Sequence, residues 1–500
     1  MNEQETVFSV DVAAAGTPIG RSWELAVGSG DAWSLLREDL QGQLRRAVRE
    51  CGFRFLRCHG ILSDQMQAVL RNRAGEIVYN WRLVDTAYDV LLGLGLRPFV
   101  ELGFMPTALA SGTQAVFYYR ANVTPPADYD AWRQFITALV SHWRDRYGVE
   151  EIRRWYFEVW NEANLSAFWS GTKEESFRLH AETVRAIKSV DAELRTGGPA
   201  STRAEWLSDF LAYCREHAVP VEFVSTHVYP DDDDFGKVDP GYRAEFERGG
   251  YLERVVAGAN AALASAVPGA APEVHWTEWN SSWRWGRPLH DLPNQAAYIC
   301  RVIHAVHAQV ASFAYWTISD IFNEFPFPAA SFVGGFGLLT IDGLPKPGYH
   351  AYQLLHRLGD RELPVRRDAD DAASATRLDL WATRRAGMLQ LLLSNYVPPG
   401  LEGRPLPVQQ VAVHLGGMGA GAALQAAEWR IDDTHANGLA AWEALGRPQA
   451  PTRAQLAELS AAAELRQSGS VPLSVSSGGG AVLRLSLPPG GVAFYELAVS

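Results

Sequence analysis

The chain has 500 residues, more than one hydrophobic core usually organises, so we expect two to three domains, one of them a barrel of roughly 250 residues or more. Hydrophobic residues make up 47% and charged residues 20%, which is typical of a well-packed globular protein and not of a disordered one. The net charge of −12, without any basic block, argues against a nucleic-acid partner.

The ends and the cysteines of the sequence bear on where the protein works. The first residues, Met1 to Glu5, are acidic and lack the basic and apolar regions of a secretory signal, and no apolar run approaches the length of a membrane span. The cysteines are scattered, without the spacing of a metal site: Cys51, Cys58, Cys214 and Cys300. The sequence therefore predicts a cytoplasmic protein with reduced thiols and no membrane partner.

Strand and helix patterns alternate from about residue 22 to residue 358. Eight such units over this length favour a (β/α)₈ TIM barrel over an open doubly wound sheet. The expected strands are Trp23–Val27, Phe53–His59, Arg97–Leu102, the stretch beginning at Trp155, Arg195–Gly197, Val221–Tyr229, Glu273–Trp279 and Ser312–Thr317.

The composition changes after about residue 360. Short runs of alternating apolar residues are separated by Pro, Gly and Ser clusters, with one helix expected at Thr452–Ala463. This pattern predicts an accessory all-β sandwich domain, whose edge we expect to include the N-terminal stretch Thr6–Val12. The predicted domains are residues 13–358 for the barrel and residues 1–12 plus 359–500 for the sandwich.

Two strands of the predicted barrel each deliver a glutamate among tryptophans. Glu162 follows the fourth strand and Glu278 lies near the end of the seventh. Chemistry in such barrels lies at the carboxyl ends of the strands. Period-two alternation places Glu158 on the same face as Glu162 but deeper, so we expect a buried ion pair of Glu158 with Arg54 or Arg57 that acts as structural support.

Two other segments carry expectations of their own. The long loop 103–126 is expected to form an aromatic lip over a ligand, with Phe104, Phe117, Tyr118 and Tyr119. The acidic run Asp231 to Asp234 lacks the spacing and the glycine of a calcium loop, so we expect a solvated loop there.

Two carboxylates across a barrel mouth suit glycoside hydrolysis, in which one is held protonated as the acid and the other stays ionised as the nucleophile. Asn161 is suited to bind a sugar hydroxyl, and Tyr229 or an arginine to hold Glu278 ionised. A metal site is the competing use of His59, His227 and the two glutamates. No His-x-x-x-His, Glu-x-x-His or cysteine pairing supports it, so no metal and no cofactor are predicted.

Five stretches in order resemble the glycoside hydrolase family 39 β-xylosidases, over nearly the whole chain. They lie at residues 57–61, 157–164, 226–230, 277–280 and 431–437, and read RCHGI, FEVWNEAN, THVYP, TEWN and IDDTHAN. The resemblance implies a retaining mechanism. The usual motif has Pro at the position of Ala163, a change that affects the rigidity of the loop and leaves the carboxylate of Glu162 in place.

The resemblance also implies roles by position. Glu162 would be the general acid/base and Glu278 the nucleophile, and Asn161 would bind the 2-hydroxyl of the sugar. Tyr229 would orient Glu278. The remaining residues expected around the −1 sugar are His59, His227, Trp316 and Glu324.

The predicted function is that of a retaining exo-glycosidase that releases xylose from β-1,4-xylo-oligosaccharides, so a small oligosaccharide is the expected partner; no oligomeric state is predicted. Two alternatives stay open at this point. One is α-L-iduronidase-type or arabinosidase activity on the same scaffold, and the other is a non-catalytic glycan-binding barrel. Iduronate carries a carboxylate that would call for added Lys or Arg at the pocket, whereas the loops near Tyr229 and Glu324 are acidic or aromatic.

Overall fold

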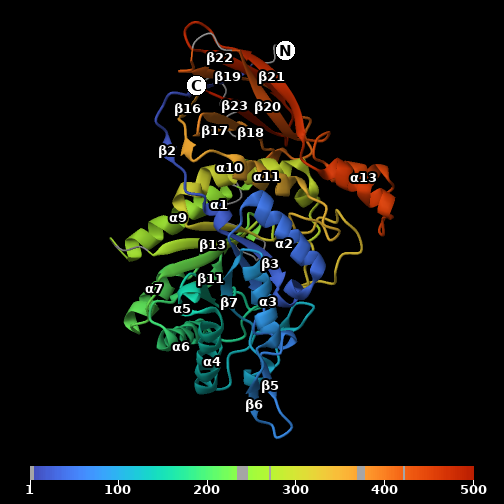
Figure 1. The fold of residues 1–500 in the computed structure, drawn as a ribbon. Helices are drawn as coiled ribbons and strands as arrows, with labels where there is room; N and C mark the ends of the chain where they lie inside the picture. The colour runs from blue at the N-terminus through green and yellow to red at the C-terminus, as the bar shows by residue number, and fades with distance from the viewer. Residues whose placement is uncertain are drawn as a thin grey trace.

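The computed structural model describes residues 5–232, 246–267, 269, 272–368, 378–419 and 423–499. Figure 1 shows two parts stacked on one another, a barrel surrounded by helices and a β-rich domain that carries both chain ends. Among the described residues, every helix is too short or too polar to span a bilayer.

Eight parallel strands close into the barrel, which confirms the predicted (β/α)₈ class. Each strand pairs with the next one in the chain, and β14 pairs with β3 through Tyr315 and Val27 to close the ring. The strands are β3 (Ala26–Asp31), β4 (Phe55–His59), β7 (Arg97–Leu102), β10 (Tyr156–Val159), β11 (Arg195–Thr202), β12 (Phe223–Val228), β13 (Glu273–Trp279) and β14 (Ser312–Tyr315).

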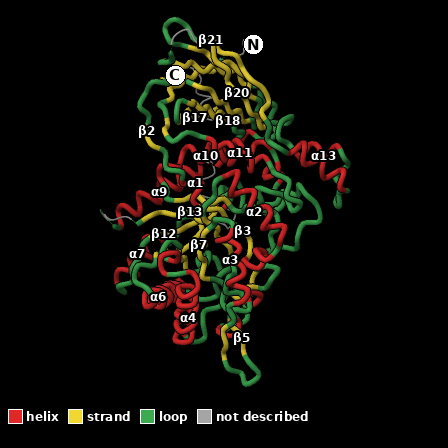
Figure 2. Tube along the Cα trace, viewed as in Figure 1, coloured by secondary structure: helices red, strands yellow, loops and turns green. Residues whose placement is uncertain are grey.

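The helices between the strands form the outer layer of the barrel (Figure 2). Helix α6 shows why they form: Thr172 and Glu175 make a reciprocal capping box at its start, and its apolar face is buried. The main helices are α2 (Glu38–Cys51), α3 (Arg82–Gly93), α4 (Tyr129–Tyr147), α6 (Lys173–Val190), α7 (Leu207–Glu216), α9 (Tyr251–Ala266), α10 (Pro293–Val306) and α11 (Pro347–Arg357).

The first barrel strand lies further along the chain than the sequence predicts. Ser22–Leu25 forms a short helix, α1, and β3 only begins at Ala26. An apolar residue lies at position 23 for a reason other than a strand: the ring of Trp23 is fully buried and lies 5.4 Å from the ring of Trp381 in the β domain. A contact between domains therefore produced a pattern that is typical of a strand.

Strand β11 is longer than the Arg195–Gly197 that the sequence predicts, because it continues to Thr202. Glycines have a low strand propensity, so the sequence around Gly197 and Gly198 does not predict that the strand continues to Thr202. Their small size is required here, since a Cβ on Gly197 would come within 2.3 Å of the carbonyl oxygen of Phe223.

The β domain consists of two sheets whose inner faces share one apolar core, as in a sandwich. The four-stranded sheet has the order β16 (Val365–Arg367), β1 (Thr6–Asp11), β19 (Gln409–Gly416), β22 (Ala481–Leu487). The seven-stranded sheet has the order β2 (Thr17–Pro18), β15 (Arg361–Glu362), β17 (Leu378–Arg385), β18 (Met388–Asn395), β23 (Val492–Ala498), β20 (Ala423–Ile431), β21 (Gln467–Ser474).

The N-terminal strand β1 joins this domain, but inside a sheet and not at its edge. Phe8 of β1 pairs with Arg367 of β16 on one side and with Val413 of β19 on the other. Strand β21 and helix α12 (Gly438–Ala444) were not expected, while α13 (Arg453–Ala463) covers the helix expected at Thr452–Ala463, with Thr452 as its cap. The division of the chain at residues 12/13 and 358/359 stays a prediction.

Candidate active site

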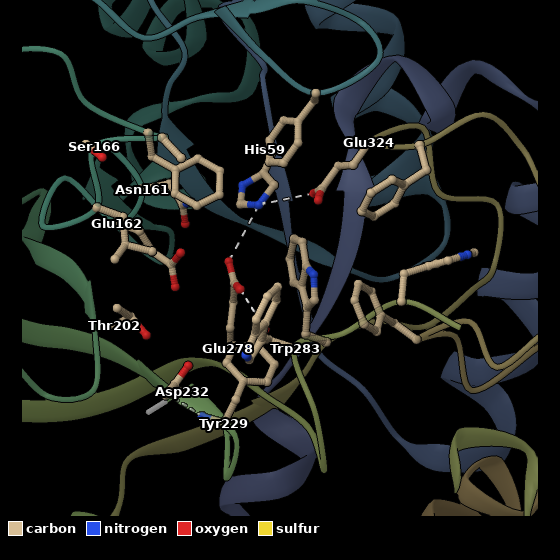
Figure 3. A pocket seen from close by; sticks show the side chains of 18 residues that line it. His59, Asn161, Glu162, Ser166, Thr202, Tyr229, Asp232, Glu278, Trp283 and Glu324 are labelled. Atoms are coloured by element: carbon tan, nitrogen blue, oxygen red, sulfur yellow. Dashed lines mark hydrogen bonds and ion pairs between the residues drawn. The ribbon is translucent and has the colours of Figure 1, made fainter. Parts of the chain in front are cut away.

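A pocket of about 380 Å³ opens at the carboxyl ends of the barrel strands (Figure 3). It takes in seven of the eight side chains that the sequence predicts for the site, and the eighth, His227, lies directly beside it. The pocket is lined by His59, Phe117, Asn161, Glu162, Leu165, Ser166, Ala167, Phe168, Thr202, Tyr229, Asp232, Glu278, Trp283, Trp285, Trp316, Glu324, Phe325 and Phe336.

Glu162 and Glu278 face one another across the pocket. Each side chain is largely buried, and a carboxylate oxygen of one lies within 4.8 Å of a carboxylate oxygen of the other. In Figure 3, Glu278 lies in the middle of the pocket, with Glu162 on one side and Glu324 on the other. At this spacing, one bound molecule can contact both carboxyl groups at once.

The backbone at the end of β10 is bent into an unusual conformation to present Glu162. Trp160 and Glu162 have φ angles of +69° and +45°, in the left-handed region that side chains other than glycine rarely adopt. Hydrogen bonds hold the turn: the Trp160 indole N–H donates to the carbonyl of Phe168 at 2.9 Å, and the N–H of Glu162 to the carbonyl of Ala200 at 2.8 Å. Such conformations cluster at functional sites, where the surrounding structure enforces them.

Arg57 is the cation at the floor of the site. It pairs with Glu158, as one of the two expected alternatives, and the pair is fully buried. Burial opposes ionisation of Glu158, but the charge of Arg57 prevails and lowers the pKa of that carboxyl. The expectation that this pair is only structural support is wrong, because Arg57 also donates to Glu278 Oε1 at 2.7 Å and to Asn161 Oδ1 at 3.0 Å.

Glu278 is held by two donors, which suits a carboxylate that must stay ionised and correctly oriented. The Tyr229 hydroxyl donates to Oε2 at 2.8 Å, while Arg57 donates to Oε1. Burial and the neighbouring Glu278 raise the pKa of Tyr229 well above its usual value, so this hydroxyl keeps its proton. The sequence offered Tyr229 or an arginine for this task, and the structure places both there.

Glu162 lies in surroundings that favour its neutral form. Burial raises the pKa of Glu162 to about 7, against the opposing charges of Arg57 and Arg203. Its Oε1 lies 2.8 Å from Nδ1 of His227. The two carboxyl groups therefore have different surroundings, since burial favours the neutral form of Glu162 whereas Arg57 and Tyr229 donate hydrogen bonds to Glu278.

His59 joins the floor of the pocket to its far wall. Its Nε2 lies 3.6 Å from Glu278 and 3.4 Å from Glu324, while Nδ1 contacts Glu101 (Figure 3). The ring of Trp316 packs against His59 with 4.6 Å between centroids. Burial raises the pKa of Glu324 well above its usual range, and its Oε1 has no hydrogen-bond partner among the described residues.

The expectation of a solvated loop at Asp231 to Asp234 is wrong for its two described residues. Asp231 and Asp232 are not solvated: the backbone N–H of Trp283 donates to Asp231 at 3.0 Å, and the N–H of Tyr229 to Asp232 at 2.8 Å. Asp232 is 3% exposed and lines the pocket, whereas Asp233 and Asp234 lie outside the described residues.

The aromatic lip is smaller than expected. Phe117 alone of its four aromatic residues lines the pocket, stacked on His59 at 5.8 Å. Phe104 is fully buried in the core and Tyr118 is 65% exposed, and neither lines the pocket.

A helical pair in the β domain packs against the loop that carries Glu324. Helices α12 and α13 contribute Trp442 and Leu459 to a cluster with Phe332 and Leu344 of this loop. On the inner side of the loop, the buried Lys346 pairs with Asp291 and Asp320. The β domain therefore contributes no residue to the pocket lining described above, yet it contacts the loop that forms one wall.

Glu162, His227 and Glu278 each offer one ligand atom within 4.8 Å of the others, which is the spacing that a metal site would need. Hydrogen bonds already use both nitrogens of His227, because Nδ1 contacts Glu162 at 2.8 Å and Nε2 contacts Thr277 at 3.1 Å. Two carboxylates and one histidine also match none of the usual zinc ligand sets, which include at least two His or Cys side chains. We assign this group to proton chemistry.

Three side chains that contact the site residues were missed or misjudged from the sequence. Arg57 was assigned to support alone, Glu101 was not considered, and Thr277 was read only as part of a motif. Burial raises the pKa of Glu101 to about 8, although Arg57 opposes this from 3.0 Å. Its place at the end of β7 was the available signal, since charged residues at the ends of barrel strands face the site.

Comparison with known proteins gives a consistent result. The model of the family described as Glycosyl hydrolases family 39 matches residues 6–479. A β-xylosidase of Caldicellulosiruptor saccharolyticus is 39% identical over 453 residues, 90% of each chain, and a β-xylosidase of Geobacillus stearothermophilus is 39% identical over 442 residues, 87% of this chain and 84% of the relative. The crystal structure of a monomeric β-xylosidase from Caulobacter crescentus CB15 superimposes with a TM-score of 0.85 at 33% identity, covering 98% of this chain and 99% of the other.

Proposed function

The chain belongs to glycosyl hydrolases family 39 and is a glycoside hydrolase, and we propose that it is a retaining exo-β-xylosidase. Its substrates are xylosides and β-1,4-xylo-oligosaccharides, from whose non-reducing end it releases xylose by double displacement. Glu278 is the nucleophile and Glu162 the general acid/base.

In the first step, a carboxylate oxygen of Glu278 attacks the anomeric carbon of the terminal sugar. Glu162 gives its proton to the glycosidic oxygen as the bond from that oxygen to the anomeric carbon breaks. The alcohol or the shortened oligosaccharide leaves, and the sugar stays as an ester on Glu278.

In the second step, Glu162 is a carboxylate and takes a proton from a water molecule in the place of the departed group. The resulting hydroxide character lets the water oxygen attack the anomeric carbon, and the ester bond to Glu278 breaks. Glu162 is again protonated and Glu278 ionised. Two inversions at the same carbon give net retention.

The observation that carries this proposal is the separation of the two carboxyl groups. Retaining glycosidases hold them about 5–5.5 Å apart, whereas inverting ones leave about 6.5–9.5 Å for a water molecule. The approach of the carboxylate oxygens of Glu162 and Glu278 to within 4.8 Å supports direct attack by Glu278.

The pocket also supports a neutral terminal sugar. Its described lining contains neither Lys nor Arg, so a sugar that carries a carboxylate would find no cation in the lining to pair with. This argues against iduronidase-type activity. Glu324 and Trp283 lie across Glu278 from Glu162 (Figure 3), so the sugar that Glu278 attacks would meet this wall at the end remote from the leaving group. That arrangement favours exo action.

Asn161 is oriented for the role that its position implies. Arg57 can only donate, so its 3.0 Å contact fixes the carbonyl oxygen of the Asn161 amide towards the guanidinium. The amide N–H₂ is then the group left to donate to a hydroxyl of the sugar. A pocket with both carboxyl groups in reacting positions also argues against a non-catalytic glycan-binding barrel.

The test uses Glu278→Gly and a panel of p-nitrophenyl glycosides. The wild-type enzyme should hydrolyse the β-xyloside faster than the α-L-arabinoside, the α-L-iduronide or the β-glucoside. Glu278→Gly should lose nearly all turnover, and azide should restore it by attacking the anomeric carbon from the vacated side, which gives the inverted α-xylosyl azide. Normal turnover in Glu278→Gly would refute the nucleophile, and a wild-type preference for another sugar would refute the substrate.

A further inference from the structure

Four side chains, three on barrel strands and Glu162 on the turn after β10, form an unbroken chain of hydrogen bonds that ends at the acid. Thr277 Oγ1 donates to Glu158 Oε1 at 2.9 Å and lies 3.1 Å from Nε2 of His227. Nδ1 of His227 in turn lies 2.8 Å from Glu162 Oε1. Glu158, Thr277 and His227 are fully buried, so water does not interrupt the chain.

The direction of each bond follows from the chemistry of the donors. Arg57 keeps Glu158 ionised, and a carboxylate can only accept. The hydroxyl of Thr277 has one proton, which goes to Glu158, so its lone pair faces His227. The adjacent nitrogen, Nε2, must therefore carry a proton.

The last bond is then also determined. Burial lowers the pKa of His227 to about 4, so the ring is neutral at neutral pH and carries a single proton, on Nε2. Nδ1 is left with a lone pair, and a 2.8 Å contact to a carboxyl oxygen needs a proton between the two atoms. That proton belongs to Glu162.

We propose that Thr277 is a positioning residue that fixes the tautomer of His227, and that His227 in turn holds the proton on Glu162 before substrate binds. Thr277 touches neither the pocket nor the reacting atoms. Its effect reaches the reaction only through the protonation state of the general acid.

Other charged groups also act on the two ends of the chain. Those facing Glu162 are Arg57, Glu101, Arg203, Tyr229, Asp232, Glu278 and Glu324, and those facing His227 are Arg57, His59, Glu101, Glu158 and Glu278. Thr277→Val leaves all of them in place and removes only the hydroxyl, so a change of the pH profile in this variant is assigned to the chain itself.

The test compares Thr277→Val with Thr277→Ser. Without the hydroxyl, Nε2 loses its acceptor, and the tautomer with the proton on Nδ1 can donate to ionised Glu162. Donation to the charged form lowers the pKa of an acid. We expect the alkaline limb of kcat/KM in Thr277→Val to move at least about one pH unit lower, with a roughly tenfold loss above the limb for phenyl β-xyloside. Thr277→Ser keeps the hydroxyl and should restore the profile.

The matched control is Thr183→Val, the same change at a buried threonine of α6. Its hydroxyl accepts from the Trp132 indole at 2.8 Å, outside the site, so this variant should lose stability and keep the wild-type limb. If the limb of Thr277→Val also stays in place while its melting temperature falls, Thr277 serves packing alone and the proposal fails. Thr277→Ala replaces Thr277→Val if the latter does not fold.

The inference rests on the proposed function for its kinetic part, so a second measurement is made on the free enzyme. Two-bond ¹H–¹⁵N correlations of histidine-labelled protein, with His227→Asn for assignment, should show the Nε2–H tautomer in the wild type and its loss in Thr277→Val. An Nδ1–H tautomer in the wild type would overturn the inference whatever the substrate. Absence of xyloside hydrolysis with the expected tautomer would instead refute only the proposed function.

Discussion

Replacing Glu162 with glutamine removes the acid proton while keeping the shape of the side chain. The glutamine amide can donate to Nδ1 of His227 across the same 2.8 Å contact, so the variant should fold normally. A positioned general acid contributes about 10²–10⁴-fold, which is about 3–5 kcal/mol of barrier at 1.36 kcal/mol per tenfold. The Glu162 side chain is only 9% exposed, so bulk water does not replace it.

The loss should depend on the leaving group. For xylobiose or phenyl β-xyloside, whose leaving oxygen needs a proton, we expect kcat/KM of Glu162→Gln to fall by about 10²–10⁴. For 2,4-dinitrophenyl β-xyloside, which leaves without a proton, kcat/KM should change little, while kcat falls because the second step has lost its base. Azide should raise this kcat and yield β-xylosyl azide with retained configuration.

The pH profile gives an independent check. The pKa of about 7 means that wild-type kcat/KM for phenyl β-xyloside should decline tenfold per unit above about pH 7, as Glu162 loses its proton. Glu162→Gln cannot lose that proton, so its residual kcat/KM for phenyl β-xyloside should lack this limb. Equal losses on both substrates, or a limb that persists in the variant, would refute the assignment of Glu162 as the acid.

Three further predictions follow from other contacts. Tyr229→Phe removes the 2.8 Å donor to Glu278, so kcat/KM should fall on both activated and unactivated xylosides. A hydrogen bond to a charged group is worth about 1.5–3 kcal/mol, so the fall should be about tenfold or more. A loss confined to unactivated substrates would contradict this role of Tyr229. Burial opposes the charge of His304, but Asp379 at 2.7 Å prevails and raises the pKa of His304 from 6.5 to about 9. His304→Gln should therefore lower the unfolding free energy by at most about 3 kcal/mol below pH 6.5, and this difference should shrink between pH 6.5 and 9. A difference that stays constant with pH in denaturant titrations would exclude the ion pair as its source. Dialysis against EDTA should leave kcat/KM unchanged, and a loss that zinc restores would reassign Glu162, His227 and Glu278 to a metal site.

The barrel and the positions of its strand-end residues were predictable because both follow from local periodicity. Alternation fixes which residues of a strand share a face, so Glu158 and Glu162 could be placed at different depths from the sequence alone. The partners of Arg57 were harder, because Glu101, Glu158 and Glu278 come from three other strands and only the closed barrel brings them together.

The errors have physical causes of the same kind. Trp23 was assigned to a strand because its burial comes from the β domain, over 350 residues away in sequence, and no local pattern reports that contact. Asp232 was expected in solvent because a run of four aspartates is usually hydrated. Instead, the backbone N–H of Tyr229 donates a hydrogen bond to its carboxylate, which is buried. In both cases a tertiary partner outweighed the local signal.

The place of β1 inside a sheet has a consequence for synthesis. Thr6 pairs with Val411, so the first strand of the chain has no complete sheet to enter until roughly 400 more residues have been made, on the order of 20–80 s at about 5–20 residues per second. Until then β1 lacks its partner strands β16 and β19, and unpaired strand edges invite association with other chains. The four-stranded sheet of the β domain thus depends on segments about 400 residues apart, and a ribosome that stalls between them would release a chain in which β1 has no partner strand.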